Sequence, residues 1–161
     1  VVYAGHTLTT GDPERRSYCC GLTFEVYVRA LLAAGAGRPV DGVSAETLHE
    51  LRLRFFGDSK VAPERRRLCQ FGLESLELGT SITNLEDAMA GDFVQLWRHS
   101  GSGHSAIFVN WVWKKDVIVG LTYWSTQSST HGIGYHTEEI GPGAIRRDEL
   151  FVARATWPAS N

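Results

Sequence analysis

The spacing of apolar residues along the chain changes near residue 90. Upstream they recur every three or four positions, and downstream they form short runs of β-branched and aromatic residues separated by glycine or charge. The first spacing is typical of helices with one buried face, and the second is typical of strands. Helices followed by strands indicate an α+β fold rather than alternating α/β units.

Three helices are expected in the first part of the chain. One spans 21–34 and ends at Gly35, with helically spaced positions at Leu22, Val26, Arg29 and Ala30. A second is capped by Ser44 and ends at Gly57, with a buried face of Leu48, Leu51 and Phe55. A third begins near Pro63 and ends at Gly79, with Leu68, Phe71 and Leu76 on a partial apolar face and Cys69 as a buried thiol.

Five strands are expected after residue 90. They are 92–98, 104–113, 117–126, 133–140 and 149–156. The polar stretch between Trp113 and Val117 has the form of a hairpin turn, so we expect a mostly antiparallel sheet.

Composition and charge narrow the classes of partner. A chain of 161 residues with 43% hydrophobic and 21% charged residues fits one globular domain, 1–161. The net charge of −2 provides no attraction to phosphate backbones, so we expect no nucleic-acid partner, and the basic run at 64–67 is interpreted as a solvated helix face. No window approaches the roughly 20 apolar residues of a membrane-spanning helix, so no membrane span is expected. We expect a monomer.

The three cysteines indicate free thiols. Cys19 and Cys20 are adjacent, and a disulfide between neighbouring residues is strained. The sequence has no CxxC pair and no HExxH run, so no metal site is expected.

Cys19 lies at the opening of the first expected helix. The unpaired N–H groups and the positive end of a helix stabilise a thiolate, and they also donate to an oxyanion formed at a carbonyl under attack. The thiolate needs a base, and His104 is the favoured histidine because it follows the loop 100–103 and opens a strand, where we expect it at the sheet edge and accessible to substrate. The other histidines are interpreted as structural or surface residues.

Three segments resemble the NlpC/P60 cysteine peptidases. Tyr-Cys-Cys-Gly-Leu at 18–22 is similar to their Asp-Cys-Ser-Gly-Leu, with Cys19 at the nucleophile place and Cys20 at the serine place. One step along a helix start rotates a side chain by about 100°, so either thiol could face the cleft; the alignment favours Cys19 as the nucleophile and leaves Cys20 as a substrate or oxyanion candidate. Ala-Gly-Asp-Phe-Val at 90–94 is similar to their Pro-Gly-Asp-Leu-Val, and Gly-His-Ser-Ala-Ile-Phe at 103–108 to their Gly-His-Val-Gly-Ile-Tyr. The order and approximate spacing fit, whereas 36–84 matches nothing in the family.

The resemblance implies a fold and a substrate class. The fold is papain-like, with N-terminal helices packed on a mostly antiparallel sheet of five or six strands. The activity is hydrolysis of amide bonds in bacterial cell-wall (peptidoglycan) stem peptides, without a cofactor. The chain starts at Val1 without Met, which suits a trimmed product, and with this substrate we expect an extracytoplasmic location.

The resemblance also implies supporting residues. Tyr3 resembles the family tyrosine that helps form the oxyanion site, with a core or surface aromatic as the alternative. Tyr18 stands where the family has aspartate, and no histidine stands at the third catalytic place. Ser125 or Gln127, which share one face of a strand, are the candidates to orient His104. Trp124 is the candidate to line a substrate groove.

Two other functions remain open from the sequence. The same Cys19–His104 pair serves a papain-like acyltransferase or deamidase, because pocket shape chooses the acceptor. The missing third histidine also fits a catalytically weak module that binds the cell wall.

Overall fold

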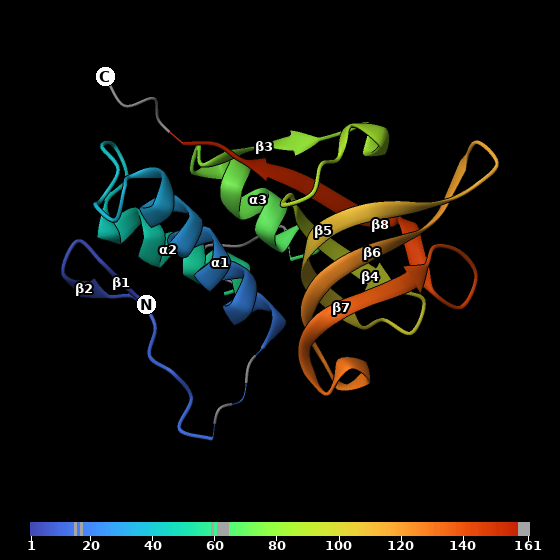
Figure 1. The fold of residues 1–161 in the computed structure, drawn as a ribbon, viewed down its shortest axis with the longest axis horizontal. Helices are drawn as coiled ribbons and strands as arrows, with labels where there is room; N and C mark the ends of the chain where they lie inside the picture. Colours follow the sequence, from blue (N-terminus) through green and yellow to red (C-terminus); the bar gives the residue numbers. More distant parts are fainter. Residues whose placement is uncertain (15, 17, 59, 61–64, 158–161) are drawn as a thin grey trace.

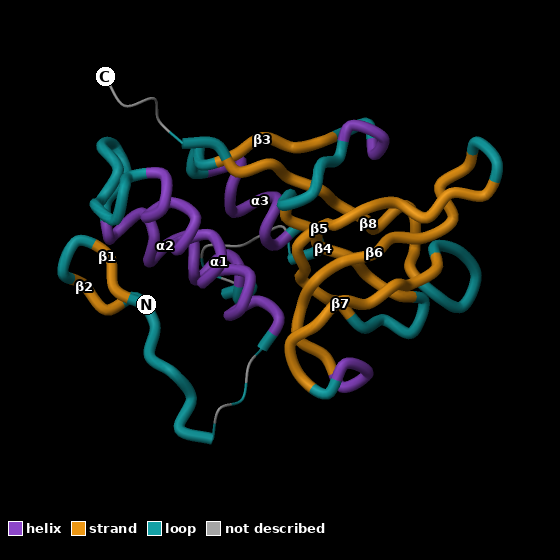
Figure 2. Tube along the Cα trace, in the orientation of Figure 1, coloured by secondary structure: helices purple, strands orange, loops and turns teal. Residues whose placement is uncertain are grey.

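In the described part of the chain, three helices lie on one side and a curved sheet on the other (Figures 1 and 2). The computed structural model describes residues 1–14, 16, 18–58, 60 and 65–157. Its helices are α1 (Cys19–Ala34), α2 (Ala45–Phe55) and α3 (Leu68–Ser75). The expected α+β class is confirmed.

The main sheet has six strands in the order β3-β8-β4-β5-β6-β7, and neighbouring strands are antiparallel. The strands are β3 (Gly79–Ile82), β4 (Phe93–Arg98), β5 (Gly103–Lys114), β6 (Val117–Gln127), β7 (Gly132–Glu139) and β8 (Ile145–Ala155). A separate pair, β1 (Val2–Tyr3) and β2 (His6–Thr7), lies near the N-terminus. Two short 3-10 turns cover Leu85–Asp87 and Ser128–Thr130.

The predicted strands 92–98, 104–113, 117–126, 133–140 and 149–156 correspond to β4 to β8, and the predicted hairpin turn joins β5 to β6 at Lys115 and Asp116. β3 was not predicted. Its short sequence, Gly-Thr-Ser-Ile, has little apolar pattern, and it forms a strand by pairing along β8. Gly79 begins β3 instead of ending a helix. A glycine is needed at this position because a Cβ there would lie 2.5 Å from the Arg154 carbonyl oxygen of β8.

The helices confirm the prediction in part. Ser44 caps α2 by accepting from the Thr47 N–H, and the expected face of Leu48, Leu51 and Phe55 is buried. α3 ends at Ser75, and its buried residues are Cys69, Gln70, Gly72 and Leu73 rather than the predicted partial face; Pro63 lies outside the described residues. The predicted face of α1 was wrong: Thr23, Phe24, Tyr27, Val28 and Leu31 are buried.

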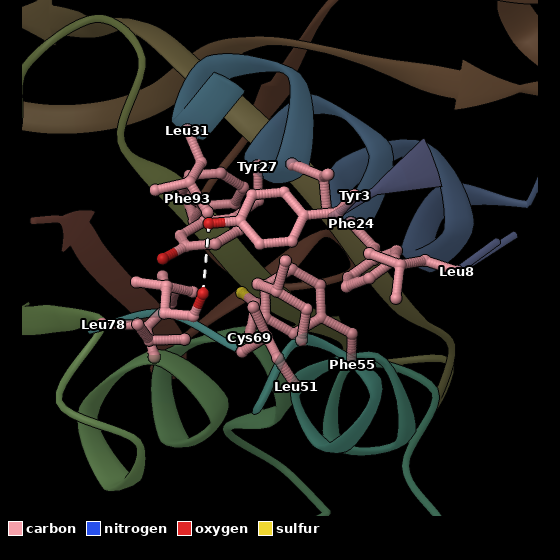
Figure 3. Close-up of a cluster of buried hydrophobic side chains, with 14 of the residues drawn as sticks. Tyr3, Leu8, Phe24, Tyr27, Leu31, Leu51, Phe55, Cys69, Leu78 and Phe93 are labelled. Carbon is pink, nitrogen blue, oxygen red and sulfur yellow. Dashed lines mark hydrogen bonds between the residues drawn. The ribbon is translucent and has the colours of Figure 1, made fainter. Parts of the chain in front are cut away.

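Two hydrophobic clusters lie on opposite faces of the sheet. The first joins the helices to residues such as Phe93 and Ala153. In this cluster Phe24 of α1 packs against Phe55 of α2, and Tyr27 of α1 packs against Phe93 (Figure 3). The second fills the other face of the curved sheet with Val94, Ala106, Phe108, Tyr123 and their neighbours. Strand residues alternate between the clusters because successive side chains point to opposite faces.

No helix within the described residues is both long enough and apolar enough to cross a membrane.

Candidate active site

Helix α1, which packs against β5 and β6, carries both vicinal thiols in its first turn. Tyr18, the N-cap residue, is extended and makes no side-chain cap bond, so the chain turns into the helix at Cys19. The Thr23 hydroxyl lies 3.0 Å from the Cys19 carbonyl oxygen and 3.1 Å from that of Cys20 and donates to them. These hydrogen bonds of Thr23 stabilise the turn that carries the thiols. Both thiols are half-buried.

The pairing between β5 and β6 ends near this turn of α1. Their paired register begins at Ile107 opposite Trp124, although β5 starts at Gly103 and β6 continues to Gln127. The peptide groups of Ser105 bond elsewhere: its N–H interacts with the Cys19 thiol, and its carbonyl oxygen accepts from Ser125 Oγ at 2.7 Å. The open end of the ladder therefore holds the nucleophile candidate.

The electrostatic environment favours a thiolate at Cys19. The hydrogen bond from the Cys20 side chain is the largest cause of a pKa far below that of an ordinary thiol; burial opposes it, and the His104 side chain and the Ser105 N–H add to it. The same contact raises the pKa of Cys20. Of two thiols that share one proton, Cys19 carries the charge because it alone contacts His104 and the Ser105 N–H.

His104 lies on an inner strand of the sheet and is buried. The expectation of an accessible position at the sheet edge was wrong: β5 lies between β4 and β6, and His104 is 7% exposed. Its ring packs at 5.5 Å on the Tyr123 ring. His104 Nε2 is buried and has no hydrogen-bond partner. The Cys19 sulfur is half-buried, whereas the imidazole is buried.

The strand that presents His104 is fixed by Trp97. Trp97 stands opposite Gly103 in the β4–β5 register, and a Cβ on Gly103 would lie 2.8 Å from the Trp97 ring. The indole N–H donates to the Arg66 carbonyl oxygen at 2.7 Å, which anchors the ring. The glycine before His104 therefore allows the close packing of the indole on the strand.

The two candidates to orient His104 have different surroundings. Ser125 is fully buried, and its hydroxyl donates to the Ser105 carbonyl, so it supports the β5 backbone and not the imidazole; that assignment was wrong. Gln127 makes no hydrogen bond to His104, but its Nε2 is buried without a partner, as is Nε2 of His104. Gln127 Oε1 lies 3.0 Å from the Tyr123 hydroxyl.

The structure places Tyr3, Cys20 and Trp124, the supporting residues that the resemblance implies, in three different environments. Tyr3 is a core residue: it is 1% exposed, it donates to the Val43 carbonyl oxygen at 3.2 Å, and it accepts from the Val40 N–H at 2.8 Å (Figure 3). These bonds occupy its hydroxyl, so its expected oxyanion role was wrong. Cys20 acts on the Cys19 sulfur. Trp124 is half-buried opposite Ile107 and Tyr135, on the face away from Ser125, and its groove role stays a prediction.

Sequence reasoning missed a polar cluster behind His104. Tyr123 lies two residues before Ser125, so the strand period already put it on the predicted face. Its partners Arg98 and Glu138 come from β4 and β7, and only the folded sheet brings them together.

Among the described residues, no group of three or more His, Cys, Asp or Glu side chains is arranged to hold a metal ion. Comparisons of the chain with protein-family models, with curated proteins and with solved structures found no match.

Proposed function

We propose that this chain is a cysteine hydrolase of the NlpC/P60 type, with Cys19 as the nucleophile and His104 as the base. One observation carries the proposal: the His104 side chain and the Ser105 N–H meet at a half-buried cysteine in the first turn of a helix. A thiolate next to an imidazole is the arrangement that nucleophilic thiol catalysis requires.

The reaction follows from these groups. The Cys19 thiolate attacks the scissile carbonyl, and free N–H groups of the first turn of α1 donate to the oxyanion. The Nδ1–H of protonated His104 transfers its proton to the leaving amine as the C–N bond breaks. Neutral His104 then takes a proton from water, the hydroxide attacks the thioester carbonyl, and the acid product leaves as the thiolate is restored.

The wider architecture supports the same assignment. A helix whose first residue is the nucleophile packs against an antiparallel sheet that bears the base, as expected for a papain-like fold. The two hydrophobic clusters share the faces of one sheet, which supports a single catalytic domain over 1–161. We propose bacterial cell-wall stem peptides, or a related amide, as the substrate, and an extracytoplasmic location.

Gln127 is the residue that we assign to orient His104. It stands in line with His104 when the β5–β6 register is extended past Ile107 and Trp124, and both residues carry a buried Nε2 without a partner. An amide oxygen at this place accepts from His104 Nε2–H and fixes the ring with Nδ1 toward Cys19.

Incubation with purified peptidoglycan and with free stem peptides, followed by mass spectrometry, tests the proposal. We expect new amine and acid termini with the native chain and none with Cys19→Ala. Cys20→Ser is the matched control, since it changes the neighbouring thiol and retains a hydroxyl donor. Amide exchange or deamidation without chain cleavage would indicate the transferase or deamidase, and hydrolysis by Cys19→Ala would refute the assignment.

A further inference from the structure

A partly buried polar network lies against the His104 ring, which packs on the ring of buried Tyr123. Its centre is the Tyr123 hydroxyl, which lies 2.9 Å from Glu138 Oε2, 3.0 Å from Gln127 Oε1 and 3.3 Å from Arg98 Nη2. Arg98 also pairs with the Glu138 carboxylate through Nε at 2.6 Å and Nη2 at 2.8 Å. The phenol ring packs between the rings of His104 and His136, at 5.5 and 5.7 Å.

The hydroxyl of Tyr123 has one proton and two neighbouring oxygens to receive it. The ionised Glu138 side chain is acceptor-only, and a bond to a carboxylate is about twice as strong as one between neutral groups. Arg98 beside it holds the pKa of Glu138 below its usual range although burial opposes this, so the carboxylate stays ionised near neutral pH. The Tyr123 O–H therefore donates its hydrogen bond to Glu138. Toward Gln127 the phenol oxygen acts as an acceptor.

An acceptor at Tyr123 selects one orientation of the Gln127 amide. The NH₂ group must face the phenol, because two oxygens without a proton between them repel. A half-turn about the last side-chain bond achieves this, and it exchanges the amide nitrogen and oxygen. The buried Nε2 of Gln127 then has Tyr123 as its partner, and Oε1 is free to accept from the buried Nε2–H of His104.

We propose that Tyr123 is a positioning residue, which the Arg98–Glu138 ion pair sets as a hydrogen-bond acceptor and which thereby turns the Gln127 amide oxygen toward His104. The inference rests on the proposed function, because it concerns how the same imidazole is held. It accounts for both unpartnered nitrogens in the described part of this network with one rotation.

The pH dependence of Cys19 alkylation by iodoacetamide tests this proposal without knowledge of the substrate. Tyr123→Phe keeps the ring and loses only the oxygen. We expect it to raise the half-maximal pH of alkylation by about half a unit, the scale of one weakened hydrogen bond to an ionised group, because a loosened His104 stabilises the thiolate less. Gln127→Ala is expected to raise it at least as much, and the double variant no more than Gln127→Ala alone.

Tyr135→Phe is the matched control, since Tyr135 is 70% exposed on β7. Urea unfolding of each variant checks that the fold is retained. If Tyr123→Phe does not fold, Glu138→Gln replaces it: without the carboxylate the phenol proton is no longer drawn from Gln127, and the half-maximal pH is again expected to rise.

The outcomes separate this inference from the proposed function. A wild-type half-maximal pH equal to that of the unfolded chain overturns both. A low wild-type value that Tyr123→Phe (or its replacement, Glu138→Gln) leaves unmoved overturns the positioning role alone. So does a double variant whose shift is the sum of the two single shifts, because Tyr123 would then act independently of Gln127.

Discussion

The thiol of Cys19, the first residue of α1, meets the side chain of His104, near the start of β5, at the point where β5 and β6 separate. Neither element alone makes this site. The helix start supplies unpaired N–H groups, and the open strand end supplies the imidazole and the Ser105 N–H.

Removal of the Cys20 thiol should weaken the Cys19 thiolate. The Cys20 side chain is the largest cause of the lowered Cys19 pKa, so Cys20→Ala should move the alkylation profile of Cys19 to higher pH. Cys20→Ser keeps a donor and should move it less. Peptide mass spectrometry after timed alkylation measures this at Cys19 itself. Equal profiles for native and Cys20→Ala chains would contradict the assigned contact.

Loss of the imidazole should affect both charge and turnover. His104→Ala removes a donor to the thiolate, so the Cys19 pKa should rise. Hydrolysis should fall by roughly 10²–10⁴-fold, the usual contribution of a general acid–base group. His49→Ala is the matched control, because His49 is an exposed residue of α2. Similar rates for the two variants would remove His104 from the mechanism.

Gly103→Ala should destabilise the strand that bears His104. The added Cβ would lie 2.8 Å from the Trp97 ring, which its bond to the Arg66 carbonyl holds in place. Overpacking of this kind costs about 1–3 kcal/mol, measurable by urea unfolding. Gly11→Ala is the control, since nothing lies within 4 Å of its Cβ position. An equally small effect of both substitutions would show that the Trp97 ring does not require a glycine at position 103.

Glu138 should make stability depend on acidity. Burial raises its pKa, but the hydrogen bond and charge of Arg98 and the Tyr123 hydroxyl outweigh this, so the folded pKa lies below the ordinary value of 4.5. A carboxyl with a depressed folded pKa contributes stability above its unfolded pKa and loses it as the pH falls through the folded pKa. The stability difference between native and Glu138→Gln chains should therefore be constant above about pH 5.5 and shrink below pH 4.5.

Urea unfolding at several pH values measures this difference. Glu139→Gln, an exposed change on the same strand, should show no comparable acid dependence. A gap between native and Glu138→Gln chains that stays constant down to pH 3 would contradict the ion-pair account.

The sequence predicted most elements because their signals are local. Ser44 and the Leu48, Leu51 and Phe55 spacing defined α2, and the two polar residues between β5 and β6 defined their hairpin. The α1 face was mispredicted because spacing gave Leu22 and Val26 the same weight as Phe24 and Tyr27, whereas the larger rings fill the core.

The site was predictable only in its two principal residues. Cys19 and His104 carry local signals, a helix start and a strand start after a glycine loop. Other features of the site depend on residues distant in sequence. They are the burial of His104, the hydrogen bond of Ser125 to Ser105, and the hydrogen bonds of Tyr3 to Val40 and Val43. Those contacts exist only once the helices pack on the sheet.

Alkylation of the native chain with iodoacetamide across pH 4 to 10 tests the central claim most directly. The account predicts that Cys19 reacts at a half-maximal pH far below that of the urea-unfolded chain, because its folded pKa is lowered. Buried Cys69, whose pKa burial raises to about 12, should stay unmodified throughout. If Cys19 reacts only at the pH of the unfolded chain, no activated thiolate exists and the hydrolase proposal is wrong.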